Sequence, residues 1–199
     1  MADFTASTTA LLIVHLQNDI VSEGTAFGAL FADQARERRV VAQTNAAAQA
    51  IREKGGLVVP LRIAFAPDHA NLNPSLPLLQ MVAEAGCLKD GTPGAALVDE
   101  LEVTETDQVV THLRPGPFTD SSLQEVLTSR GIESVVVSGV ATNASVEGVV
   151  RQAADLGYRT AVLSDATSAA DAASHEASLA SMGLFATPLT VDELRAGLT

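Results

Sequence analysis

The residues of this chain with the clearest chemical potential stand where buried strands are predicted to end. Ser145 lies at the predicted start of a helix, just after an apolar run, while His15 and His112 each close a short apolar run. The carboxyl ends of strands in an open parallel sheet meet at one edge. We therefore expect His15, His112 and Ser145 to converge there, with Arg62 and Asp165 at the same edge.

Such a convergence would suit acyl transfer or proton transfer. A serine hydroxyl is a weak nucleophile unless a neighbouring base removes its proton, and a neutral imidazole can do so near pH 7. Backbone N–H groups at the start of a helix can hold an oxyanion. Each residue also has a purely structural interpretation, because a serine at this place commonly caps a helix and a histidine at a strand end commonly holds a loop.

The elements that must position these side chains follow from hydrophobic periodicity. Uninterrupted apolar runs rich in β-branched residues predict strands buried on both faces, and Pro60 within one of them suggests an edge or an irregularity. Asn143 and Asp171 are expected to cap the helices that follow them, and Ser121 with Gln124 forms a possible capping box. Strands are predicted at 10–15, 57–63, 108–112, 134–139, 159–164 and 184–186, and helices at 34–54, 76–84, 121–130, 143–157 and 171–182.

This alternation predicts an α/β fold: a three-layer, doubly wound domain around a mainly parallel sheet, in a single domain over residues 1–199. The long irregular connection 64–107 is typical of a lid or a subunit contact. With 47% hydrophobic residues, the chain can fill a sizeable core.

Charge and cysteine content restrict the partners. The net charge of -12 argues against nucleic acid and anionic membranes, because binding to either needs clustered Lys and Arg. The single cysteine, Cys87, excludes an internal disulfide framework, and we interpret it as a packing residue. Neither a signal peptide nor a transmembrane run is evident, so we expect a soluble cytoplasmic protein.

Four motifs resemble those of the isochorismatase-like cysteine hydrolases. They are residues 11–19 (LLIVHLQND), 91–95 (GTPGA), 109–112 (VVTH) and, the most specific, 139–147 (GVATNASVE). The resemblance implies a six-stranded parallel sheet, an oligomer such as a homodimer or tetramer, and hydrolysis of small-molecule amides by Asp, Lys and Cys. It also implies a cis peptide at Val140–Ala141, with the N–H groups of Ala141 and Ser145 as the oxyanion hole. From their positions in the sequence we expect Thr142, Asn143, Arg62 and Phe118 to contact the substrate.

At all three catalytic positions the chain departs from the family pattern. His15 stands where the family has aspartate, His112 where it has lysine, and Ser145 where it has cysteine. The usual cysteine mechanism therefore cannot operate. Residues 66–70 (APDHA) do not reproduce the Asp-x-His motif of the metal-dependent nicotinamidases in the family, so we predict no metal and no other cofactor.

Four hypotheses follow for a small-molecule substrate. The first is a hydrolase in which Ser145 is the nucleophile and His15 or His112 the base. The second is a lyase or isomerase whose two histidines move protons without a nucleophile. The third is a ligand-binding relative without catalysis. The fourth is a metal site formed by His15, His112 and Asp19. Few aromatic residues stand in the loops (Phe27, Phe65 and Phe118), which suggests a small ligand.

Overall fold

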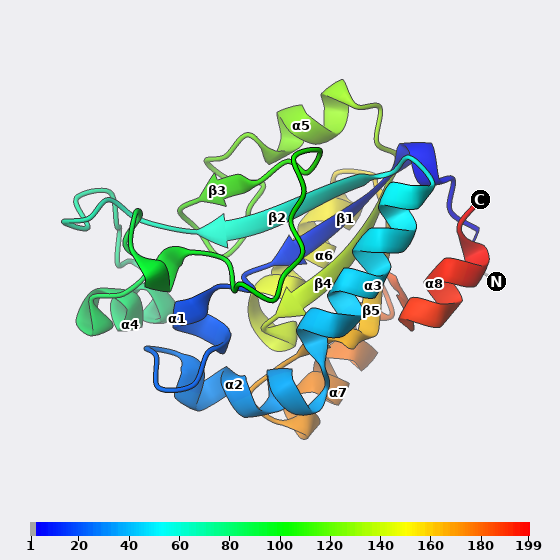
Figure 1. Ribbon diagram of the computed structural model, residues 1–199. Helices are drawn as coiled ribbons and strands as arrows, with labels where there is room; N and C mark the ends of the chain where they lie inside the picture. The colour runs from blue at the N-terminus through cyan, green and yellow to red at the C-terminus, as the bar shows by residue number, and fades with distance from the viewer. Residues whose placement is uncertain (1–2) are drawn as a thin grey trace.

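The computed structural model describes residues 3–199 as an α/β fold around one six-stranded sheet (Figure 1). All of the strands are parallel, and their order across the sheet is β3-β2-β1-β4-β5-β6. The predicted three-layer fold is confirmed. The strands are β1 (Thr9–Val14), β2 (Leu57–Ile63), β3 (Val110–His112), β4 (Ser134–Val140), β5 (Arg159–Ser168) and β6 (Thr187–Leu189).

Helices cover both faces of the sheet. On one face α3 and α8 bury apolar side chains such as Ile51 and Leu194, and α1 and α4 join the same core. On the other face α5, α6 and α7 bury Leu123, Val149 and Met182. In the described part of the chain the helices are α1 (Asn18–Val21), α2 (Gly28–Glu37), α3 (Val40–Glu53), α4 (Pro77–Ala85), α5 (Leu123–Ser129), α6 (Glu147–Asp155), α7 (Ala172–Met182) and α8 (Val191–Gly197).

The helix predicted at 34–54 is wrong in one respect, because the chain forms two helices there. Arg39 adopts a left-handed conformation with φ of 54° between α2 and α3. Its neighbour Arg38 donates hydrogen bonds to the carbonyls of Ser164 and Thr167. A tertiary anchor on β5 thus accompanies the break, and the helical periodicity of the sequence does not reveal it.

Other boundaries also differ from the prediction. The last strand lies at 187–189 rather than 184–186, and Leu184 is 85% exposed. Strand β3 begins at Val110, two residues later than predicted. Pro60 lies just before the first residue pair between β2 and β3, where its missing N–H interrupts no observed pairing. Asp171 caps α7 as predicted, through the N–H of Ser174.

Two predicted caps take other forms. Asn143 is exposed and lies inside a π-helical turn, Thr142–Val146, whose capping position is Ala141. Ser121 accepts a hydrogen bond from the N–H of Leu123, while the Gln124 side chain contacts other side chains, so no capping box forms.

The chain order reverses between β1 and β4. From β1 the chain continues through β2 and β3 to one edge, and it then returns to β4, β5 and β6 on the other side. Loops that follow β1 and β4 separate at this point and leave a crevice, which is where open α/β sheets bind ligands. His15 follows β1, and Ser145 lies just beyond β4. In the described residues no helix is both long and apolar enough to cross a membrane.

Candidate active site

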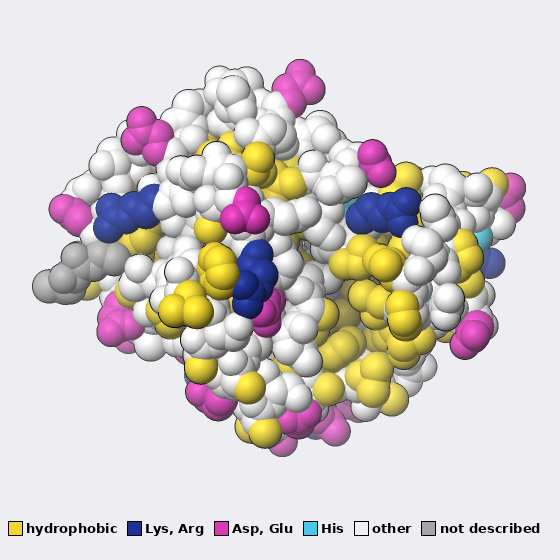
Figure 2. Space-filling model, turned by 180° about the vertical axis from the view of Figure 1, so that it is seen from behind, with side chains coloured by type: hydrophobic (Ala, Val, Ile, Leu, Met, Phe, Trp, Pro, Cys, Tyr) yellow, Lys and Arg dark blue, Asp and Glu magenta, His cyan; other side chains and the backbone are white. Residues whose placement is uncertain are grey.

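An apolar pocket opens at the carboxyl ends of β1 and β4. Its empty space is about 470 Å³, part of which is open to solvent. Figure 2 shows a hollow with hydrophobic side chains gathered around it, on the side of the molecule that carries α1, α2 and α4. The lining residues are His15, Ile20, Phe27, Phe31, Ile63, Leu78, Leu79, Val82, Leu88, Pro115, Val140, Ala141, Ala144 and Ser145.

His15 is held by its backbone as well as by its side chain. It has a φ of 51°, and its N–H donates to the carbonyl of Leu61 on β2. Positive φ is uncommon for residues other than glycine and often marks functional sites. Beside it, β4 approaches β1 so closely that a Cβ on Gly139 would lie 2.0 Å from the carbonyl oxygen of Val14. Only glycine fits there, and this close approach sets the spacing between the two strand ends.

The two predicted histidines are in direct contact. Nε2 of His15 lies 3.1 Å from Nε2 of His112, and Nδ1 of His112 lies 2.7 Å from the carbonyl oxygen of Arg114. Because a carbonyl only accepts, Nδ1 of His112 carries a proton, and its Nε2 is the acceptor in the neutral ring. His15 therefore donates from Nε2. In its neutral form, its Nδ1 keeps a free lone pair.

Burial keeps both rings neutral. Desolvation, followed by the proximity of His112, lowers the pKa of His15 well below its usual value. Desolvation also lowers the pKa of His112 to about 4, although the bond to the Arg114 carbonyl opposes this shift. At neutral pH the pair thus carries no charge, and Nδ1 of His15 is the ring nitrogen of the pair that is left to accept a proton.

Ser145 lies in the π-helical turn that joins β4 to α6. The peptide between Val140 and Ala141 is cis, as expected from the family resemblance. The carbonyl of Ala141 accepts from the N–H groups of Ala144 and Val146, which closes the turn around the serine. Ser145 is buried to 4% exposure and lines the pocket, and its hydroxyl has no hydrogen-bond partner among residues 3–199.

A second polar network holds the π-helical turn at Thr142. Thr142 Oγ1 lies 2.8 Å from Nδ1 of His175, and Nε2 of His175 lies 2.7 Å from the Arg38 guanidinium. Since arginine only donates, Nε2 of His175 accepts and its Nδ1 donates to Thr142. Ser178 donates to the carbonyl of Thr142. These bonds connect the turn to α7 and to the α2–α3 junction.

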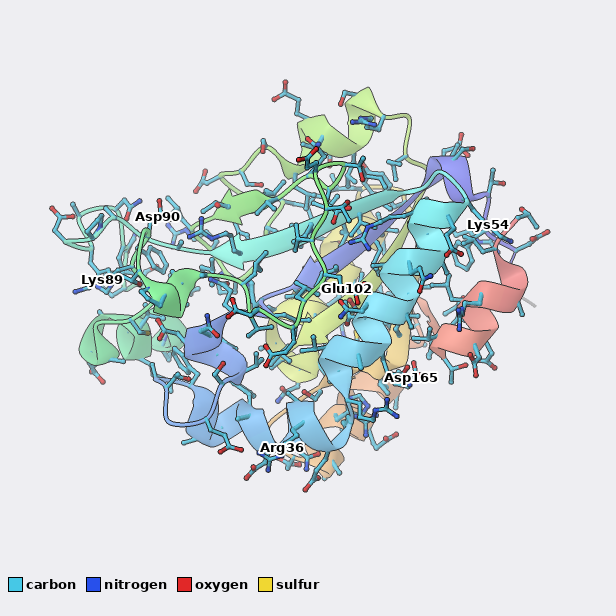
Figure 3. The ribbon with its side chains drawn as sticks, viewed as in Figure 1. Arg36, Lys54, Lys89, Asp90, Glu102 and Asp165 are labelled. Atoms are coloured by element: carbon cyan, nitrogen blue, oxygen red, sulfur yellow. The ribbon has the colours of Figure 1, made fainter. Side chains whose placement is uncertain are left out.

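Several predicted residues do not reach the pocket. Arg62 pairs with Asp90 at 2.6 Å, and Phe118 stacks on Tyr158 against the core on the α5–α6 face. Asp165 accepts from the N–H of Val191 at the start of α8. Figure 3 shows Asp165 on the side where α3 and α8 lie, with Asp90 toward the opposite end of the molecule. A shared sheet edge therefore does not bring every strand end into one cavity.

The remaining candidates also have other surroundings. Thr142 faces His175 rather than the pocket, and Asn143 is exposed. Burial, together with the nearby Asp19, raises the pKa of the Cys87 thiol to about 11, which suits a packing role. Asp19 accepts from the N–H of Leu88. Within residues 3–199, no group of three His, Cys, Asp or Glu side chains is arranged to hold a metal ion.

Comparison with known proteins agrees with this architecture. Residues 9–193 match the isochorismatase domain. The chain belongs to the isochorismatase family. It is 31% identical over 171 residues to the isochorismatase family protein YwoC of Bacillus subtilis, with 86% of this chain and 83% of the relative covered. It is 35% identical to the ureidoacrylate amidohydrolase RutB of Pseudomonas syringae, with 80% of this chain and 70% of the relative covered.

Two solved structures superpose closely on this fold. An isochorismatase family protein from Desulfovibrio vulgaris has a TM-score of 0.83 at 25% identity, over 95% of this chain and 97% of that one. A cysteine hydrolase from Pseudomonas syringae pv. phaseolicola has a TM-score of 0.86 at 23% identity, over 99% and 95% of the two chains. The second likeness shows the fold alone.

Sequence reasoning missed two parts of the site. Part of the apolar wall comes from α1, α2 and α4, which precede or interrupt the irregular connection, and nothing in their periodicity assigns them to a pocket. The Arg38–His175–Thr142 network was also missed. The sequence signal that could have revealed this network is His175, a histidine on the buried face of the helix predicted at 171–182.

Proposed function

We propose that this isochorismatase-family protein is a small-molecule hydrolase in which Ser145 is the nucleophile and His15 the base. The observation that carries the proposal is that both residues line one pocket while His112 holds His15 from behind. Of the two histidines, only His15 is a lining residue, so His112 acts through it as a positioning residue. Amide hydrolysis by the relative RutB makes an acyl compound the natural substrate.

In the first step, Ser145 Oγ attacks the substrate carbonyl carbon as its proton passes to Nδ1 of His15. The resulting imidazolium is stabilised by His112, whose Nε2 accepts the hydrogen bond from His15. The carbonyl electron pair moves to oxygen, where the N–H groups of Ala141 and Ser145 would hold the oxyanion. When the C–N or C–O bond breaks, the leaving group takes the proton from His15 and an acyl-serine remains.

In the second step, water replaces the leaving group. His15 removes a proton from a water molecule as the water oxygen attacks the acyl carbon. Collapse of the tetrahedral intermediate breaks the bond to Ser145, and the proton on His15 returns to the serine oxygen. The net reaction consumes one water and releases a carboxylic acid, with both residues restored.

The hydrogen bonding of the site favours a second candidate function. The two imidazoles bond to each other, and the Ser145 hydroxyl has no partner among the described residues. A lyase or isomerase could use the histidine pair to accept and donate protons while Ser145 only binds substrate. This version predicts that Ser145→Ala keeps substantial turnover, whereas His15→Ala abolishes it.

Acylation with p-nitrophenyl acetate separates these functions. We expect a rapid release of p-nitrophenolate and one acetyl group in the intact mass, and we expect both to disappear in Ser145→Ala. Ser129→Ala is the matched control, because Ser129 is an exposed serine on α5 and should not affect labelling. Equal labelling of the wild type and Ser145→Ala would reject covalent catalysis by Ser145. If no acyl compound is turned over or labels the protein, the hydrolase function is rejected, and the lyase or isomerase and the non-catalytic binding protein remain.

A further inference from the structure

The chemistry of the pocket wall restricts what can bind beside Ser145. Among the described residues, no Asp, Glu, Lys or Arg side chain lines it. Apart from His15 and Ser145, the lining side chains are aliphatic, aromatic or proline. They come from α1, α2 and α4, from the ends of β2 and β4, and from the turns and loops around Phe27, Leu88, Pro115 and Ala144. The polar groups are thus confined to the reacting end of the cavity.

Three cationic side chains lie close to the wall in sequence or in the fold, and none of them is among the lining residues. Arg62 pairs with Asp90 and bonds to the carbonyl of Ala95. Arg114, which adjoins the lining residue Pro115, extends its guanidinium toward Ser75 Oγ at 3.4 Å. Lys89 adjoins the lining residue Leu88, but it borders a separate hollow together with Asp19 and Cys87. None of these groups is placed to neutralise an anion inside the pocket.

The local field also disfavours an anion. The hydrogen bond that Nε2 of His112 accepts requires a neutral His112 ring, and burial, which lowers the pKa of His15, keeps that ring neutral before any reaction, so neither offers a positive charge to a ligand. Asp19, bonded to the N–H of the lining residue Leu88, puts a carboxylate just behind the wall. A bound carboxylate would lose its water without gaining a charged partner, and it would be repelled by Asp19.

From these contacts we infer that the substrate is an uncharged compound whose acyl group is apolar, a short alkyl chain or one ring, and that carboxylate-bearing acyl groups are excluded. This inference rests on the proposed function, since it assigns the acyl group to the pocket beside Ser145. Selectivity comes from the cost of burying an unpaired charge, and the apolar walls supply the affinity.

Two esters of equal chain length test the inference. The value of kcat/KM is measured at neutral pH for p-nitrophenyl butyrate and for p-nitrophenyl hydrogen succinate, each corrected for its spontaneous hydrolysis. We expect a preference for butyrate of about 100-fold or more, because the succinyl carboxylate must be desolvated without a partner. Equal values, or a preference for succinate, would overturn the inference even with the hydrolase function intact.

A pair of variants at Leu78 localises the effect. Leu78 is half-buried on α4 and lines the pocket, so a longer side chain there can reach both the cavity and solvent. We expect Leu78→Lys to reduce the preference by about 10-fold, because the ammonium pairs with the carboxylate. Leu78→Met, of similar volume and no charge, keeps the preference for butyrate. If Leu78→Lys leaves the ratio of the two kcat/KM values unchanged, the apolar wall is not the source of the preference for butyrate.

Binding without turnover separates failure of this inference from failure of the proposed function. If neither ester shows turnover that depends on Ser145, the hydrolase function falls, and ligand-observed NMR with butyramide and succinamate decides the rest. Broadening of butyramide signals alone, lost in Leu78→Lys, supports a pocket for neutral apolar ligands. Equal broadening by both compounds, or by succinamate alone, overturns it.

Discussion

Two buried histidine sites in this protein share an electrostatic environment but differ in what surrounds them. At the carboxyl ends of β1 and β3, His15 and His112 bond to each other, and His15 lines an apolar pocket. Against the π-helical turn that carries Ser145, His175 on α7 is bonded on both nitrogens, to Arg38 and to Thr142. Burial lowers the pKa of all three histidines, and Arg38 adds to the effect at His175.

The difference lies in spare hydrogen-bonding capacity. His175 has used both of its ring nitrogens and is completely buried, so its bonds can only hold structure. His15 uses one nitrogen for His112, and among residues 3–199 its other nitrogen has no partner. A depressed pKa therefore does not identify a functional histidine by itself. An unused nitrogen beside a cavity and a hydroxyl is the more specific signal.

Truncation of His15 should produce the largest effect on activity. We expect His15→Ala to lower kcat/KM by about 100-fold to 10,000-fold, because no other base lines the pocket within the described residues. The fold should survive, since the side chain borders a cavity that water can enter. Steady-state kinetics and urea unfolding of the same preparation test this. Activity within tenfold of wild type would remove His15 from the proposed mechanism.

Acid should destabilise the protein through the histidine pair. The folded-state pKa of His112 is about 4 against an ordinary value of 6.5, so the unfolded chain binds the proton first as the pH falls. The free energy of unfolding should therefore decrease between pH 6.5 and 4, by about 3 kcal/mol from this group. Burial of His15 and His175 acts in the same direction. Urea unfolding at several pH values measures the slope.

The control for this pH dependence is His112→Gln, which removes the titrating group but keeps a donor and an acceptor. Its unfolding free energy should vary less over the same pH range than that of the wild type. An identical slope in the two proteins would assign the acid sensitivity to other groups.

His175 should matter chiefly for stability. We expect His175→Ala to lower the free energy of unfolding by about 2 kcal/mol, because the Thr142 hydroxyl and one N–H of Arg38 lose their partner in a closed interior. His175→Gln should restore part of this stability by supplying both a donor and an acceptor. A His175→Ala protein as stable as wild type would show that the network contributes nothing net.

Most of the fold could be predicted from the sequence, because the buried positions of strands and helices appear in it as apolar runs and as apolar residues at regular spacing. Runs such as Val135–Val137 show strands covered on both faces, and Gly157 marks the end of a helix. The break at Arg39 could not be predicted, since it depends on Arg38 reaching carbonyls on β5 over 100 positions away. Local patterns do not encode such contacts.

The candidate site was predictable only in part, for a related reason. Topology places side chains at the ends of strands, and so His15 and His112 were expected at one edge together with Arg62. Whether a side chain enters the pocket depends on its nearest partner, and Asp90 binds Arg62 from a loop that has no periodic pattern. The contribution of α4 to the apolar wall could not be predicted either, because its residues resemble those of any packed helix.

A pair of substitutions at His112 gives the smallest and most specific effect. The ring accepts from His15 and donates to the Arg114 carbonyl, and glutamine can do both whereas leucine can do neither. We expect His112→Leu to lower kcat about 10-fold, with a smaller change in KM, because His15 loses the acceptor that orients its Nδ1. His112→Gln should recover most of that loss. Equal kinetics in the two variants would mean that His112 only fills space, and the contrast with His175 would then rest on His15 alone.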